Sequence, residues 1–200
     1  MLLDASSSRL LGSGEVLIAG RARGWWSCGR ESRFHMSDNR RALSAGPRRI
    51  RLSLPDSGAS AVADLLDDDC PDTCSALWDL LPLRLKAHHD IWSGHLIRCH
   101  LEGDPYVDPE NVLTYIPVPG DVFYYHRSAH YYRGTPYGRL VSAEIGIVYD
   151  RDTRPQGPRG PEAVNLFAEI SSGLEELSRA CEAMIYEGQR ELVIERMDDT

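Results

Sequence analysis

The strongest constraint on this chain is a change in the spacing of its apolar residues at Pro82, from a helical repeat to an alternation with a period of two. Before Pro82, apolar side chains recur at positions i, i+3, i+4 and i+7, which places Cys74, Leu77, Trp78 and Leu81 on one face of a helix. After it, four segments alternate apolar and polar residues and are predicted to be strands: 94–101, 112–116, 121–126 and 141–149. This order of patterns predicts a domain that is mainly β.

Shorter segments complete the expected set of elements. Residues 50–54 alternate as a half-buried strand and stop at a turn, whereas residues 60–66 fit either a helix or the return strand of a hairpin. An acidic residue just before Pro71 can cap the helix that this proline begins, a contribution of ~1 kcal/mol. Segments 165–170 and 191–195 are predicted strands, and 172–185 a second amphipathic helix. The count is therefore roughly seven or eight strands and two helices.

Charge is distributed unevenly along the chain. Residues 1–47 contain seven Arg and four acidic residues, whereas residues 48–200 contain 15 basic and 26 acidic residues. The first segment is rich in Ser, Gly and Arg and has almost no apolar periodicity, which is typical of disorder. We therefore expect a basic, disordered extension over residues 1–47, with Met36 as an alternative start of translation, and a folded domain over residues 48–200.

Composition excludes several classes of protein. The net charge of −8 disfavours nucleic acid as a partner, and no apolar run reaches the ~20 residues that a membrane helix needs. Five cysteines without regular spacing disfavour a disulfide scaffold, and no secretory signal precedes them, so we expect a cytoplasmic protein. Homo-oligomer formation is left open.

Familiar cofactor and metal motifs are missing from the sequence. It contains no phosphate-binding loop, no Gly-x-Ser-x-Gly elbow and no complete dinucleotide fingerprint, so no cofactor is expected. Six of the seven histidines lie between residues 88 and 130, but their spacing fits no metal motif. We expect no metal, and we expect His88 and His89 to lie in a loop.

Several motifs resemble cyclophilins. Residues 69–77 (DCPDTCSAL) are similar to the start of the first cyclophilin helix, and residues 166–175 (LFAEISSGLE) to the passage from a strand into the second helix. Residues 117–123 (PVPGDVF), 148–153 (VYDRDT) and 165–181 are similar to a family of uncharacterised bacterial proteins with a cyclophilin-like fold. The resemblance spans residues 49–196. It implies a closed antiparallel β-barrel of about eight strands with two flanking α-helices.

The resemblance to cyclophilins is incomplete where prolyl isomerases perform their chemistry. Arg98 occupies a strand comparable to the one that carries their catalytic Arg. Their Trp- and His-containing stretch has no counterpart, because the chain has residues 159–164 (RGPEAV) there. Peptidyl-prolyl isomerase activity is therefore the alternative function, and a non-catalytic oligomeric module is another.

Strand parity suggests a site for a small molecule. Ile97, Cys99 and Leu101 share the expected interior face, which leaves Arg98 on the other face. Glu144 can project beside Arg98, either in a groove or as a cross-strand ion pair worth ~0.5 kcal/mol. Tyrosine and arginine are dense over residues 124–139, and they suit flat or carboxylated ligands. We expect a small, carboxylated molecule to be bound or processed in a groove formed by Arg98, Tyr124, His126, Tyr132 and Glu144.

Overall fold

The computed structural model describes residues 46–114, 116–127, 141–157 and 160–197. Its elements, in chain order, are β1 (Arg49–Leu54), β2 (Ala59–Leu65), α1 (Pro71–Leu80), β3 (Leu83–His89), the 3-10 turn η1 (Ile91–Ser93), β4 (Leu96–Leu101), β5 (Val112–Thr114), β6 (Asp121–Arg127), β7 (Ser142–Val148), β8 (Gln156–Gly157), β9 (Gly160–Pro161), β10 (Val164–Ser172), α2 (Leu174–Glu187) and β11 (Arg190–Met197). The segment that the sequence left as helix or strand is thus β2, which returns against β1 as a hairpin.

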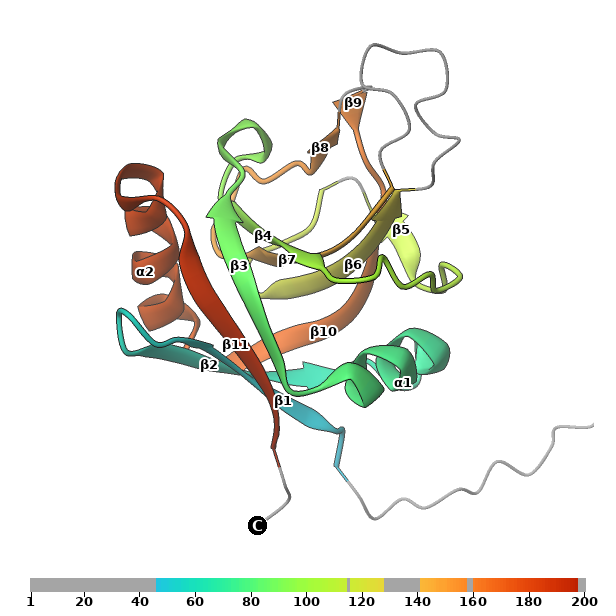
Figure 1. Cartoon of the computed structure of the whole chain (residues 1–200). Coiled ribbons are helices and arrows are strands. Elements are labelled where there is room, and N and C mark those ends of the chain that lie inside the picture. The colour runs from blue at the N-terminus through green and yellow to red at the C-terminus, as the bar shows by residue number, and fades with distance from the viewer. Residues whose placement is uncertain (1–45, 115, 128–140, 158–159, 198–200) are drawn as a thin grey trace, which may run out of the picture. The chain divides into compact units, whose positions relative to one another are not determined.

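Eight of these strands form a closed antiparallel barrel. Its order is β2-β1-β11-β3-β4-β7-β6-β10, and the pairing of β10 with β2 closes it. β5 adds to β10 outside the ring, and β8 and β9 form a separate hairpin above β4 and β7 (Figure 1). The two helices lie on either side of the barrel in the same view. The predicted fold class, a mainly β closed barrel of about eight strands with two helices, is confirmed.

Both helices bury one face against the barrel interior. α1 contributes Cys74 and Leu77, and α2 contributes Leu177, Cys181 and Met184. α1 ends before Pro82, which lacks the N–H that another turn would need, and the preceding Leu81 is extended (φ −73°, ψ 143°). No helix in the described ranges is long and apolar enough to cross a membrane.

The start of α1 is capped differently from the sequence-based expectation. The carboxylate of Glu110 accepts the backbone N–H groups of Asp72 and Thr73 at 3.0 and 2.7 Å and the Thr73 hydroxyl at 2.7 Å. The acidic residues just before Pro71 make no side-chain cap. Burial raises the pKa of Glu110, but these hydrogen bonds outweigh it and leave that pKa below its ordinary value. A carboxylate far along the chain therefore replaces the local cap.

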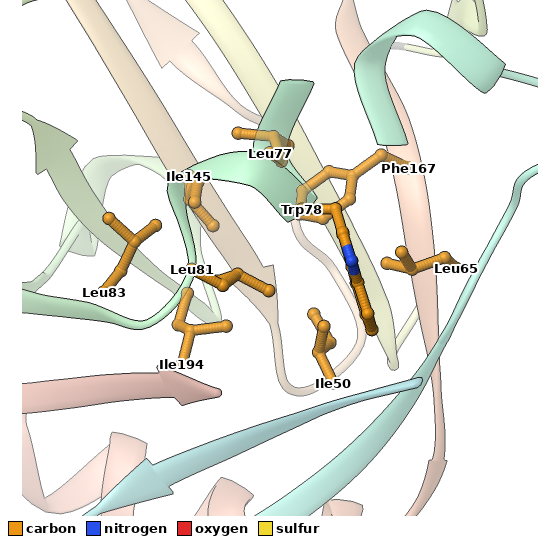
Figure 2. A pocket seen from close by; sticks show the side chains of 9 residues that line it. All are labelled: Ile50, Leu65, Leu77, Trp78, Leu81, Leu83, Ile145, Phe167 and Ile194. Atoms are coloured by element: carbon orange, nitrogen blue, oxygen red, sulfur yellow. The ribbon is translucent and has the colours of Figure 1, made fainter. Parts of the chain in front are cut away.

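A small apolar pocket lies between the C-terminal part of α1 and the strands beneath it. The indole of Trp78 lies along one side of this pocket, facing Ile50 and Leu65 (Figure 2). Arg48 and Arg196 stand over the indole ring at 5.1 and 5.2 Å from its centroid. Trp78 is therefore partly buried: its ring packs against the core, and the guanidinium groups of Arg48 and Arg196 lie over it.

The loop predicted for His88 and His89 is wrong. Both residues belong to β3, which pairs with β11 on one side and β4 on the other. The segment alternates correctly, since Leu85 and Ala87 are buried and Lys86 is exposed. It was missed because it begins directly after the helix-ending proline and buries few large side chains.

Candidate functional site

The outer face of the barrel is buried along β7 and over the parts of β4 and β6 next to it. β7 is buried along its whole length, although alternate residues of a strand point to opposite faces. Its inward residues, Ala143, Ile145 and Ile147, belong to the main core. Polar Ser142 and Glu144 point outward and are nevertheless only 8% and 2% exposed. This part of the sheet is therefore covered on its outer side as well.

A small apolar layer occupies one part of that outer face. It consists of Leu96, Phe123, Val148 and Val164, all fully buried. The ring of Phe123 lies across Gly146, its neighbour on β7, so closely that a Cβ at Gly146 would lie 2.1 Å from the ring. Only glycine leaves room for the ring at this position.

Next to the apolar layer lies a buried group of charges, here called the ionic cluster. Arg98 of β4 is 4% exposed, and its guanidinium reaches three carboxylates. Its Nη1 lies 2.8 Å from Glu144 Oε2 and 3.4 Å from Glu162 Oε2, and its Nε lies 2.7 Å from Asp90 Oδ2. Nη2 donates to the Gln156 carbonyl at 3.2 Å. Arg127 joins the cluster, whose members among the described residues are Asp90, Arg98, Arg127, Glu144 and Glu162.

Arg127 of β6 meets the same carboxylates from the other side. Its Nη1 donates to Glu144 Oε1 at 3.0 Å and to the Ser142 hydroxyl at 2.9 Å, and its Nη2 lies 3.4 Å from Glu162 Oε1. The Ser142 hydroxyl donates to Glu144 Oε1 at 2.8 Å. Glu144 and Glu162 therefore each bridge the two guanidinium groups.

The charges of the cluster stabilise one another despite their burial. Burial raises the pKa of Glu144, but Arg98 and Arg127 outweigh it, so the net result is a pKa below the ordinary value. Burial likewise opposes the positive charge of Arg98, and Glu144 and Asp90 outweigh it, so the Arg98 pKa is raised. Among the described residues, three carboxylates face two guanidinium groups.

Two histidines, His88 on β3 and His100 on β4, flank the cluster. The rings of His88 and His100 stack with centroids 5.6 Å apart. His100 Nδ1 lies 3.7 Å from Glu144 Oε1, and its side chain is 59% exposed. Burial, and then the neighbouring His100, lower the pKa of His88, so its ring is neutral near pH 7. The cluster is therefore accessible to solvent on the side where the exposed His100 lies.

The structure divides the predicted groove residues between two places. Arg98 and Glu144 lie together, and the ion pair that strand parity allowed between them is present at 2.8 Å. Tyr124 and His126 face the opposite side of β6 and line a separate pocket with Tyr106 and Asn165. Tyr132 lies outside the described residues. The five residues therefore do not form one groove in the part of the chain that the structure describes.

The pocket around Tyr124 is held by local contacts. The Tyr124 hydroxyl donates to the Pro105 carbonyl, and burial raises the pKa of Tyr124 to about 12. The rings of Tyr106 and His126 meet edge to face at 4.9 Å. Asn165 is buried, and its amide donates to the Thr73 hydroxyl at 2.9 Å. These polar groups make local contacts, whereas the ionic cluster concentrates buried charge, so the ionic cluster is the better candidate site.

Three members of the ionic cluster were not predicted. Arg127 lies in the Tyr- and Arg-rich region 124–139, and it alternates along the sequence with the same face as Phe123, but neither signal indicated its partners. Asp90 precedes η1 and Glu162 follows β9, so both lie outside the long strands, where alternation gives no direction. Their positions depend on how distant segments pack.

Comparison with known proteins identifies a family and a fold. The sequence model of a family described as "Protein of unknown function (DUF3830)" matches residues 52–195. No curated protein matches the chain.

Two solved structures are similar to this barrel. McbB, solved in complex with tryptophan, gives a TM-score of 0.57 at 17% sequence identity, over 76% of this chain and 45% of McbB. The hypothetical protein AF2241 from Archaeoglobus fulgidus gives a TM-score of 0.49 at 19% identity, over 78% of this chain and 100% of AF2241. The chain thus spans less than half the length of McbB, and the McbB similarity concerns the fold.

Proposed function

We propose that this chain, which belongs to the DUF3830 family of proteins of unknown function, binds or processes a small molecule whose carboxylate is held by Arg98 and Arg127 on the outer face of the barrel. We also propose that the barrel is a distant relative of cyclophilins. The motifs of the sequence and the closed eight-stranded ring with two helices support that relationship.

The observation that carries the proposal is the ionic cluster itself. Removing five charges from water costs several kcal/mol per ion, and well-packed apolar side chains often stabilise a fold as well or better. The adjacent layer of Leu96, Phe123 and Val148 shows that this face of the sheet can be covered by apolar residues. Buried charges with shifted pKa values are typical of functional sites.

The arrangement of the two arginines favours a carboxylate as the ligand group. Their guanidinium groups approach the same two carboxylates from β4 and from β6. A planar guanidinium matches the two oxygens of a carboxylate, and two of them bridge it. The tryptophan in the McbB complex is a carboxylated molecule, so L-tryptophan is the first probe to test.

The same geometry weighs against prolyl isomerisation. A catalytic Arg must touch the prolyl amide of a peptide, whereas Arg98 is 4% exposed and its nitrogens face Asp90, Glu144, Glu162 and the Gln156 carbonyl. We expect no catalysis in a protease-coupled assay on an X-Pro peptide. Catalysis at the rate of an ordinary cyclophilin, abolished in Arg98→Ala, would contradict the proposal.

The cellular setting that we propose is the bacterial cytoplasm. Cys70, Cys74, Cys99 and Cys181 are all buried free thiols, which is usual in a reducing compartment. A periplasmic location of a tagged full-length chain would contradict this.

The test of the ligand is a thermal-shift screen of L-tryptophan and of aromatic and aliphatic carboxylates, followed by calorimetry. A ligand at a hundred times its dissociation constant stabilises the fold by ~2.7 kcal/mol. Arg98→Lys should weaken binding at least ~10-fold, because an ammonium group cannot reproduce the planar fork. Arg84→Lys is the matched control, since Arg84 is exposed and pairs only with Glu191 among the described contacts.

Two outcomes would overturn the proposal. If no carboxylate shifts the melting temperature, and light scattering shows a stable oligomer, the chain is instead a non-catalytic oligomeric module. If a carboxylate binds equally well to the wild type and to Arg98→Lys, it binds away from the ionic cluster.

A further inference from the structure

We infer that the pocket around Tyr124 is a second binding site, which takes a small, neutral, planar ring that carries an amide or lactam group. This site lies on the other face of β6 from the ionic cluster, and it goes beyond the function proposed above. The residues that line it include Tyr106, Val107, Tyr124, His126, Ala163 and Asn165. Its size, its aromatic walls, its buried amide and the charge around it each support this assignment.

The pocket is large enough for a small ring. It offers about 80 Å³ of space, whereas the pocket beside Trp78 offers about 10 Å³. A cavity needs ~10–15 Å³ to hold one water molecule, and protein interiors contain few voids larger than that. The pocket around Tyr124 therefore has room for several water molecules or for one small ring in their place.

The walls of the pocket are largely aromatic. Tyr124 and His126 come from β6, and the ring of Tyr106 meets the His126 ring edge to face at 4.9 Å. Aromatic side chains bind flat rings by offset stacking and by edge-to-face contact. Because Tyr106 is 64% exposed, its ring is accessible to a ligand that arrives from solvent.

The segment that carries Tyr106 is fixed to the barrel. The Asp104 carboxylate accepts the Ala143 N–H at 3.1 Å, and the Pro105 carbonyl accepts the Tyr124 hydroxyl. These contacts form the pocket without a ligand. Binding therefore costs little additional ordering of the chain.

A buried amide supplies the polar contact. Asn165 is 4% exposed and is the cross-strand partner of Tyr124, so both side chains lie on the same face of the sheet. Its oxygen accepts the Asn111 N–H at 2.8 Å, and its nitrogen donates to the Thr73 hydroxyl at 2.9 Å. A carboxamide has two N–H groups and two acceptor positions, so one of each remains beyond these described contacts. The edge of an amide or lactam, with an N–H beside a C=O, matches that pair.

The charge around the pocket favours a neutral ligand. Among the described residues that line it, none is Arg or Lys. The segment that carries Tyr106 is acidic instead, since it contains Asp104 and Asp108, and the Tyr106 hydroxyl donates to Asp108 at 2.7 Å. A carboxylate in this pocket would be repelled by these groups. The pocket and the ionic cluster therefore select ligands of different charge.

The experiment compares nicotinamide with nicotinate, which share one ring and differ in carrying an amide or a carboxylate. Nicotinamide should bind the full-length wild type with a dissociation constant below ~1 mM in calorimetry, and it should shift the NMR signals of Ala163 and Asn165. Nicotinate should bind at this pocket at least ~10-fold more weakly. Uracil, a neutral lactam, is the second probe. Uracil methylated on both ring nitrogens lacks the N–H groups and is its control.

Two variants locate the site. Tyr106→Ala removes an exposed wall and should weaken nicotinamide binding at least ~5-fold, because stacking on the aromatic ring is lost. Tyr186→Ala is the matched control, since Tyr186 is 88% exposed on α2 and does not line the pocket. Asn165→Asp keeps the shape of the side chain and replaces its N–H groups by an acceptor, so nicotinamide binding should fall at least ~10-fold.

Three outcomes would overturn the inference. They are equal nicotinamide affinity in the wild type, Tyr106→Ala and Asn165→Asp, no binding of nicotinamide or uracil at millimolar concentration, and nicotinate binding in this pocket as tightly as nicotinamide. If Asn165→Asp does not fold, Tyr106→Ala decides, because its side chain is exposed. The proposed function is judged separately. Carboxylate binding that Arg98→Lys weakens and Tyr106→Ala leaves unchanged supports it, whatever the result for nicotinamide.

Discussion

Replacing Glu144 by Gln tests whether the ionic cluster is desolvated as its geometry indicates. Glu144 is 2% exposed and lies between Arg98 and Arg127 at 2.8 and 3.0 Å. The glutamine keeps the size of the side chain and removes its charge. Both guanidinium groups then lose the nearer of the two carboxylates that they share, while Ser142 loses a charged acceptor for its hydroxyl.

The expected cost follows from the burial of this pair. Removing one partner of a buried ion pair destabilises a protein by ~3–5 kcal/mol, and here both guanidinium groups lose close contacts of 2.8 and 3.0 Å. For a domain of this size, that lowers the melting temperature by about 6–20 °C. Glu191→Gln is the matched control: it breaks the 3.2 Å pair with Arg84, whose side chain is 67% exposed, and should cost at most ~1 kcal/mol.

The pH dependence gives a second and independent readout. Because the Glu144 pKa is lower in the folded state than its ordinary value of 4.5, its stabilisation is fully present above that value. It is lost as the pH falls through the lowered folded-state pKa. Urea unfolding of the wild type and of Glu144→Gln should therefore differ most near pH 7 and converge in acid.

One result would refute this reasoning. If Glu144→Gln costs no more than Glu191→Gln at pH 7, water or mobile ions solvate the cluster and it is not buried. Ser142→Ala is the milder variant should Glu144→Gln fail to fold. It removes one hydrogen bond to a charged oxygen and should cost ~1.5–3 kcal/mol.

Further predictions concern packing, capping and the domain boundary. Gly146→Ala should lower the free energy of unfolding, measured in urea, by ~1–3 kcal/mol, because the added Cβ would collide with the Phe123 ring. A smaller residue in place of Phe123 should recover part of that loss. Glu110→Gln should cost ~1 kcal/mol, a difference that disappears as the pH falls through the lowered pKa of Glu110. Trp78→Ala should cost ~3 kcal/mol in the same assay, since its ring is partly buried against the core. A chain that begins at Met36 should keep the melting temperature of the full chain, and a loss of several degrees would place part of the removed segment in the fold.

Much of the barrel could be predicted because its signals are local. Alternation over residues 94–101 correctly gave Ile97, Cys99 and Leu101 as the interior face, and all three are buried in the main core. Helix α1 followed from its apolar spacing and from Pro82. Alternation and apolar spacing depend only on residues that are close along the chain, so they can be recognised in the sequence alone.

The rest depends on contacts between distant segments. β7 is buried on both faces, so its alternation of apolar and polar residues does not separate core from solvent. Glu162 reaches Arg98 across 64 residues of sequence, and Glu110 reaches Thr73 across 37. No local pattern indicates either contact, since each is set by how loops dock on the completed sheet. Among the predicted groove residues that the structure describes, Arg98 and Glu144 lie together, and Tyr124 and His126 line a separate pocket.

The position of β11 has a consequence for how this barrel forms during synthesis. β11 lies between β1 and β3, and it pairs with both along most of its length. A nascent chain that has emerged from the ribosome only as far as α2 therefore carries two strands with unpaired edges and an open core. Long-range pairing of this kind is slow and exposes edges to association with other chains. Vectorial folding of the barrel should consequently end in one late step, the insertion of Arg190–Met197, and a nascent chain that stalls before this step is the species on which chaperones would act.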